Sequence, residues 1–190
     1  MTIASIDKHP IIRKGLGLFL QEQLENIVLL EAENYESYVR LFSNERPDLF
    51  IIGFAEESNI HESETVSFVK EKMPNIPVIV YDGEPRYEMA VYSLVAGASS
   101  YLVKNSCPTE LVKCIESVMQ GKRYMSEDVA DILLKQCMNA SKENERNATL
   151  NNENTAIHNS GIPSINPQKL SVYNKLELKN IMELSNLFLS

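Results

Sequence analysis

This 190-residue sequence has few cysteines, no long apolar run and no excess of positive charge. Its cysteines are Cys107, Cys114 and Cys137, an odd number without paired spacing, which predicts reduced thiols in the cytoplasm. No apolar run approaches the roughly 20 residues of a membrane span, and the amino terminus lacks a signal-peptide profile. The formal net charge of -8 argues against a dominant nucleic-acid or anionic-membrane surface. We therefore expect a cytoplasmic protein without a membrane partner.

Sequence motifs for enzymatic chemistry are also missing. Gly15 and Gly17 begin like a dinucleotide fingerprint, but its third glycine would fall at Leu20, within a helical pattern. No serine, cysteine, histidine and aspartate residues have the spacing of a nucleophilic catalytic set, and His61 and His158 lack ligand partners at metal spacing. The sequence predicts no enzyme, cofactor, metal ion or small-molecule substrate.

What the sequence does contain is an alternation of two apolar patterns. Short runs rich in β-branched residues predict strands at Ile3–Ile6, Ile27–Leu30, Leu49–Phe54, Val78–Tyr81 and Ser100–Val103. Helical spacing follows each run, first after Pro10 and last after Thr109, a residue type favoured at N-caps. Five strands alternating with five helices predict an α/β fold, a doubly wound parallel sheet with helices on both faces. Residues 1 to about 125 suit one such domain.

Three residues at the ends of these strands mark the expected site. Asp7, Gly53 and Lys104 each follow a strand, and open parallel sheets place their chemistry at the carboxyl ends of the strands. An aspartate in place of Gly53 would complete an acidic site able to hold a cation and a phosphoryl group. With Gly53, this edge of the sheet has no nucleophile.

An ordered set of motifs covers about residues 1 to 135. It consists of Ile6-Asp7-Lys8-His9-Pro10, Pro47-Asp48, Ala96-Gly97-Ala98 with Tyr101-Leu102-Val103-Lys104, and the stretch from Gly121 to Ser126. The set resembles the receiver domain of bacterial response regulators, most of all the NarL/FixJ class. This resemblance implies a flavodoxin-like receiver fold and a role in two-component (phosphorelay) signal transduction.

The resemblance also implies six functional positions. In that family an aspartate after the third strand accepts a phosphoryl group from a histidine kinase, two acidic residues after the first strand hold Mg²⁺, and a lysine after the fifth strand pairs with the phosphate. A hydroxyl after the fourth strand and an aromatic residue on the fifth relay the switch. This chain keeps Asp7, Lys104 and the switch aromatic Tyr101; it has Lys8, Gly53 and Asp82 in place of the second acidic residue, the phosphoacceptor and the hydroxyl residue.

Two interpretations of this degenerate pocket remain open. Asp7 and Asp82 against Lys8 and Lys104 could form a pre-paired, self-neutralised pocket, with Asp82 reaching Lys104 and so fixing Tyr101. Alternatively, the site has decayed and its charges are solvated. On either interpretation we expect a pseudo-receiver that is not phosphorylated.

The composition changes after the receiver-like part, residues 1–125. We expect a linker helix at 126–138, a disordered linker rich in asparagine at 139–168, and a remnant of a helix-turn-helix output domain at 169–190. A helix-turn-helix reader needs a second helix, so we expect no specific DNA binding from this chain alone.

Function is therefore predicted to reside in contact with a protein partner or in a homodimer. Candidate exposed contacts are Tyr87, Met89 and Tyr92, and the alternative for about half of them is packing on the sheet. The alternative is a DNA-binding transcriptional regulator of the NarL/FixJ class that acts through dimerisation or a partner. A downstream reading frame encoding the missing helices would favour that alternative.

Overall fold

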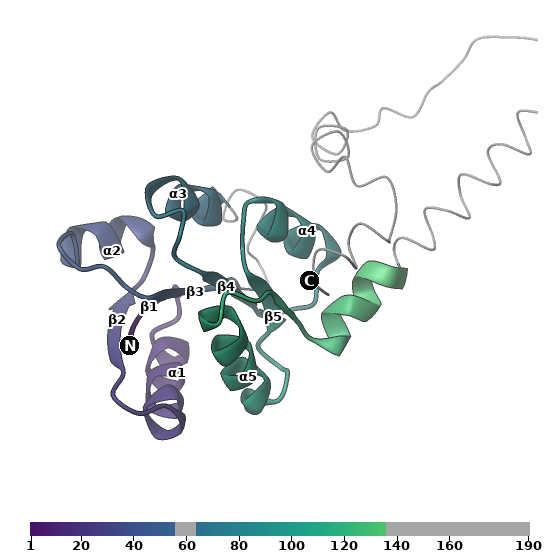
Figure 1. Cartoon of the computed structure of the whole chain (residues 1–190), viewed down its shortest axis with the longest axis horizontal. Coiled ribbons are helices and arrows are strands. Elements are labelled where there is room, and N and C mark those ends of the chain that lie inside the picture. Colours follow the sequence, from purple (N-terminus) through teal and green to yellow (C-terminus); the bar gives the residue numbers. More distant parts are fainter. Residues whose placement is uncertain (56–63, 136–190) are drawn as a thin grey trace, which may run out of the picture. The chain divides into compact units, whose positions relative to one another are not determined.

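The computed structural model describes residues 1–55 and 64–135, and the compact unit that holds the sheet is Met1–Ala130. Strands and helices alternate along this unit (Figure 1). The elements are β1 (Thr2–Ile6), α1 (Pro10–Gln23), β2 (Val28–Ala32), α2 (Tyr35–Leu41), β3 (Leu49–Gly53), α3 (Glu64–Lys72), β4 (Val78–Asp82), α4 (Tyr87–Val95), β5 (Ser100–Val103), α5 (Pro108–Met119) and β6 (Tyr124–Met125).

The strands form one parallel sheet in the order β2-β1-β3-β4-β5-β6. This arrangement confirms the predicted α/β fold and the five predicted strands. The sheet also has a sixth strand, β6, which pairs Tyr124 with Ser100 and Met125 with Tyr101. Two residues are too few to show a strand period, so the apolar pattern did not predict β6.

Helices cover both faces of the sheet: α1 and α5 lie on one face, and α2, α3 and α4 on the other (Figure 1). On the first face, buried strand residues pack against α1 and α5. The members of this core are Ile3, Leu49, Ile51, Ile79, Leu102, Leu20, Leu111, Cys114, Ile115 and Val118. On the second face, the ring of Phe50 meets that of Tyr38 of α2, edge to face at 5.1 Å. Helices on both faces explain why the central strands read as continuous apolar runs.

Local sequence signals explain several helix boundaries. Pro10 and Pro108 begin α1 and α5, where a residue without an amide hydrogen loses no helical bond. The side chain of Asn34 caps α2 by accepting the amide hydrogen of Ser37 at 2.8 Å. At α5 the N-cap is Cys107, so the expectation that Thr109 caps this helix is wrong, because Pro108 already occupies its first turn.

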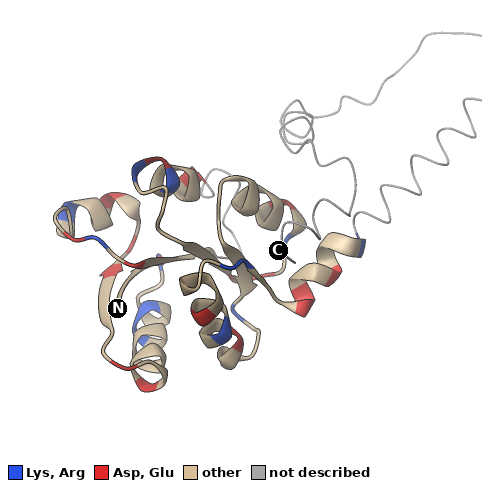
Figure 2. Cartoon of the chain, viewed as in Figure 1, with Lys and Arg blue, Asp and Glu red and all other residues tan. Residues whose placement is uncertain are grey.

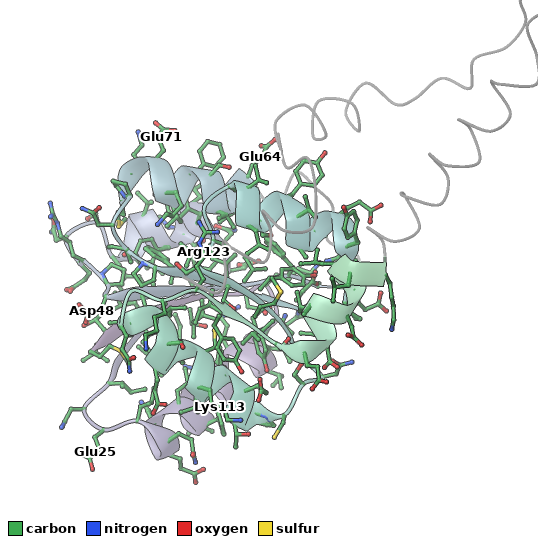
Figure 3. All side chains as sticks on the ribbon, turned by 45° about the vertical axis from the view of Figure 1, so that its right-hand side comes forward. Glu25, Asp48, Glu64, Glu71, Lys113 and Arg123 are labelled. Atoms are coloured by element: carbon green, nitrogen blue, oxygen red, sulfur yellow. The ribbon has the colours of Figure 1, made fainter. Side chains whose placement is uncertain are left out.

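Charged residues of both signs are interspersed over the helices (Figure 2). The labelled side chains of Glu25, Glu71 and Lys113 point away from the ribbon (Figure 3). Within residues 1–55 and 64–135, no helix is long and apolar enough to cross a membrane.

The predicted segments after the sheet are described only in part. Residues 127–135 are helical, and they fall within the predicted linker helix at 126–138. The predicted linker at 139–168 and the predicted helix-turn-helix remnant at 169–190 lie outside the described residues.

Candidate functional site at the carboxyl edge of the sheet

Asp7, immediately after β1, forms a buried ion pair with Lys104, immediately after β5. The Asp7 side chain is 4% exposed, and its Oδ2 lies 2.5 Å from the Nζ of Lys104. Lys104 also donates to the carbonyl oxygen of Phe54 at 2.7 Å. The other carboxylate oxygen, Oδ1, accepts the amide hydrogen of His9 at 2.8 Å and lies 3.2 Å from the His9 Nδ1. Both oxygens of Asp7 therefore have partners within the chain.

Gly53, at the end of β3, lies directly under this carboxylate. An ideal Cβ placed on Gly53 would be 1.9 Å from Asp7 Oδ2 and 2.8 Å from Asp7 Cβ, far inside any normal contact. The register explains this proximity: Ile6 pairs with Ile52, and Asp7 and Gly53 are the next residues along the chain from these two. A glycine within a strand often marks such a close approach.

Asp82, at the end of β4, forms a second buried ion pair. Its side chain is 0% exposed, and the Arg86 guanidinium contacts both oxygens at 2.7 and 2.8 Å through Nη2 and one of them at 3.2 Å through Nε. Asp82 also accepts a hydrogen bond of 2.5 Å from the hydroxyl of Tyr101 on β5. The Arg86 Nη2 further donates to the carbonyl of Ala55 at 3.1 Å.

The two ion pairs lie on opposite faces of the sheet, so Asp82 does not reach Lys104 as the pre-paired interpretation required. Gly53 and Lys104 follow Ile51 and Leu102 by two residues, so they share the face that packs on α1 and α5. Val78 pairs with Phe50, which contacts α2 on the other face. Asp82 follows Val78 by four residues along β4, so it projects from that other face. Asp82 and Lys104 are joined only through the backbone, where the Lys104 amide donates to the Asp82 carbonyl at 2.7 Å.

Lys8 was the other cation expected in the pocket, and the structure places it on the surface, in the connection from β1 to α1. The cation paired with Asp82 is Arg86, whose place in the sequence did not mark it as part of the site. Asp82 ends a strand and Arg86 precedes the first residue of α4, so the four-residue spacing of helical neighbours does not apply and no sequence pattern indicated the pairing.

Burial and hydrogen bonding shift the ionisation of two members of the second ion pair. Burial raises the pKa of the Tyr101 hydroxyl, and the hydrogen bond to Asp82 raises it further. Burial alone would lower the pKa of Arg86, but the hydrogen bond and charge of Asp82 outweigh burial and raise it. Tyr101 is therefore a neutral donor, and Arg86 a permanent cation, over the pH range in which proteins are normally studied.

A pocket of about 520 Å³ opens at this edge of the sheet. It is lined by His9, Ile12, Phe54, Ala55, Gly83, Lys104 and Asn105. Of the Asp7–Lys104 pair, Lys104 lines this pocket.

The three candidate interface residues of α4 differ in exposure. Met89 is 3% exposed, because α4 turns it toward the interior together with Ala90 and Ser93. The expectation that Met89 is an exposed contact is wrong. Tyr87 and Tyr92 are half-buried.

Comparison with known proteins agrees with this fold. Residues 3–116 match the family model of the response regulator receiver domain. The chain therefore belongs to the response regulator receiver domain family, whose members are signalling proteins.

Its relatives are response regulators of the NarL type. The chain is 29% identical over 130 residues to the transcriptional activator protein ExaE of Pseudomonas putida, covering 68% of this chain and 60% of that protein. It is 28% identical over 132 residues to the nitrate/nitrite response regulator protein NarL of Escherichia coli K12, covering 70% and 61% of the two chains. A crystal structure of a LuxR-family two-component response regulator from Aurantimonas sp. SI85-9A1 is 26% identical, with a TM-score of 0.62, and covers 71% of this chain and 96% of that one. The chain thus spans about three fifths of the length of these two curated relatives.

Proposed function

We propose that this chain is a receiver that is not phosphorylated and that acts in cytoplasmic signal transduction through protein–protein contact. The single observation that carries the proposal is the geometry at Gly53. This residue has no carboxylate, and the space its side chain would enter is filled by Asp7 Oδ2, 1.9 Å from the ideal Cβ. The position that the family resemblance assigns to the phosphoacceptor therefore has neither a nucleophile nor room for one in this arrangement.

The surrounding donor set also fits Mg²⁺ poorly. A hard divalent cation prefers several oxygen ligands, and Lys8 stands where the resemblance implies a second carboxylate. The carboxylate of Asp7 is already paired with the Lys104 ammonium. Within residues 1–55 and 64–135, no three His, Cys, Asp or Glu side chains are grouped as metal ligands. These contacts favour a pocket that is neutralised by its own side chains.

Incubation with acetyl phosphate and Mg²⁺, followed by intact-mass measurement, tests this proposal. We expect no added phosphoryl group in the wild-type chain, while a phosphorylatable receiver treated in parallel gains one. We expect the same negative result for Gly53→Asp, because the new side chain meets Asp7. A base-labile phosphoryl adduct on the wild-type chain would contradict the proposal.

Without phosphorylation, the signalling output of this receiver depends on a surface that binds a partner or a second copy of the chain. Tyr87 and Tyr92 on α4 are the remaining candidates for that surface, since Met89 is buried. Sedimentation over a range of concentrations, with and without acetyl phosphate, measures self-association. A monomer at high micromolar concentration would leave only heterologous partners.

The alternative function is transcriptional regulation through DNA. The observation that favours it is the name of one relative, a transcriptional activator, of which this chain covers 60%. On the proposal made here, the purified chain does not retard promoter fragments in a sequence-dependent way at physiological salt. A site-selective footprint that resists salt would support the alternative instead.

A further inference from the structure

We propose that Arg86 sets the switch of this receiver by holding Tyr101 inward through Asp82, so that the connection from β4 to α4 keeps one arrangement without a phosphoryl group. The three side chains, Asp82, Arg86 and Tyr101, are called the Tyr101 cluster below. The inference rests on the proposed function, because a receiver that is not phosphorylated needs another means of fixing its output surface.

The hydroxyl of Tyr101 contacts Asp82 and the backbone of the connection from β4 to α4. Its oxygen lies 2.5 Å from Asp82 Oδ2, 3.2 Å from the carbonyl oxygen of Glu84 and 3.4 Å from the amide nitrogen of Arg86. The phenol donates its one hydrogen to the nearest acceptor, Asp82, and accepts the amide hydrogen of Arg86. The backbone at Arg86 is thereby held to the hydroxyl of a side chain that is 1% exposed.

Arg86 makes this arrangement stable because it neutralises a fully buried carboxylate. Asp82 is 0% exposed, and a buried charge that loses its partner is strongly destabilising. The same guanidinium donates to the carbonyl of Ala55, just beyond β3. Arg86 consequently ties the start of α4 to the ends of β3 and β4. Outward rotation of Tyr101 would break the contact to Asp82 and open the connection.

The Asp7–Lys104 pair provides a matched internal control. It is also buried, and it lies at the same edge of the sheet, but it projects from the other face and contacts no member of the Tyr101 cluster through a side chain. If the inference is correct, breaking the Asp7–Lys104 pair lowers overall stability and leaves Tyr101 in place. If the loss of either buried ion pair affected α4 in the same way, breaking the Asp7–Lys104 pair and breaking the Asp82–Arg86 pair would accelerate exchange in α4 equally.

Hydrogen exchange followed by mass spectrometry distinguishes these outcomes. In Arg86→Met we expect amides of residues 83–92 to exchange at least about tenfold faster than in the wild type, and to be accelerated more than peptides from β1 and β3. In Lys104→Met and in Arg40→Met, an exposed arginine on α2, we expect residues 83–92 to exchange at the wild-type rate. Unchanged exchange of residues 83–92 in Arg86→Met would overturn the inference, as would equal acceleration in Lys104→Met.

A second variant keeps the test decisive if Arg86→Met unfolds. The double variant Asp82→Asn/Arg86→Met leaves no unpaired buried charge, so the fold is retained while the ion pair is lost. We expect the same local acceleration in this variant, and Arg86→Lys, which keeps the cation, should show a smaller one. Wild-type exchange in the folded double variant would overturn the inference. These measurements need no phosphodonor, so their outcome is independent of the acetyl phosphate experiment.

Discussion

Asp7 and Gly53 are neighbours across β1 and β3, and the carboxylate of Asp7 occupies the volume where a side chain at position 53 would begin. With an ideal Cβ 1.9 Å from Asp7 Oδ2, even a methyl group requires Asp7 to move. Moving Asp7 disturbs its contact with Lys104, so the glycine and the ion pair depend on each other.

The first prediction is that Gly53→Ala destabilises the protein by about 1–3 kcal/mol, the usual cost of forcing an extra methyl group into a packed site. Urea unfolding of the wild type and Gly53→Ala measures the difference. In an Asp7→Ala background the carboxylate is absent, and Gly53→Ala should cost less. A double-mutant cycle with zero coupling between positions 7 and 53 would contradict this explanation.

The second prediction concerns Lys104→Met. Asp7 is 4% exposed and would lose its cation, so we expect a loss of about 1–3 kcal/mol in the free energy of unfolding. The matched control is Lys113→Met on the outside of α5 (Figure 3), where Lys113 pairs with Glu110 at 3.1 Å in solvent. That change should cost less than about 1 kcal/mol. Equal effects of the two substitutions would show that Asp7 does not depend on Lys104.

The third prediction is a pH dependence that comes from Tyr101. Its folded-state pKa lies above the ordinary value of 10.0, so the unfolded chain releases this proton first as the pH rises. The resulting stabilisation is fully present below pH 10.0 and decreases at higher pH. Unfolding measured from about pH 8 to about pH 11 should show a less steep alkaline decline for Tyr101→Phe than for the wild type. Parallel curves would indicate that the hydroxyl is not held in the folded protein.

The fourth prediction separates two thiols by their reactivity. Cys107 is exposed, and its pKa is lowered because the side chain and backbone of Thr109 hydrogen-bond to the sulfur. Burial raises the pKa of Cys114 to about 12. In a Cys137→Ser background, a disulfide reagent near neutral pH should therefore modify Cys107 quickly and Cys114 only after unfolding. Rapid modification of both thiols in the folded protein would contradict this assignment.

The fold was predictable from the sequence because the strands are buried on both faces. Runs such as Leu49–Phe54 have no polar interruption, and helical spacing separates them from one another. β6 was missed because its two residues, Tyr124 and Met125, carry no period. The burial of Met89 was not predictable because α4 is apolar around much of its circumference, and the helical period alone does not identify its buried side.

The site was only partly predictable. The strand ends predicted that Asp7, Gly53 and Lys104 lie at one edge of the sheet, and they do. The burial of Tyr101 beside Asp82 was not predicted. The pairing of charges was not predictable by counting them, because the side chains of Asp82 and Lys104 project from opposite faces. The strand register pairs Asp82 with Val103, so Lys104, the next residue, projects from the opposite face. That register was not known from the sequence. The contact of Arg86 with Ala55 joins two connections that have no sequence pattern in common.

The ion pair between Asp7 and Lys104 joins residues 97 positions apart, nearly the whole length of the sheet-forming part of the chain. During synthesis on a ribosome, β1 emerges long before Lys104 is translated. Asp7 therefore has no Lys104 to pair with while most of the sheet is being synthesised. Contacts of such long range are formed late in folding, since the intervening chain must first be ordered. Nascent chains that end before β5 consequently lack the partner of a carboxylate that the finished domain buries. Burying this unpaired charge is unfavourable, so such chains should leave Asp7 in water and this edge of the sheet unformed until Lys104 is added.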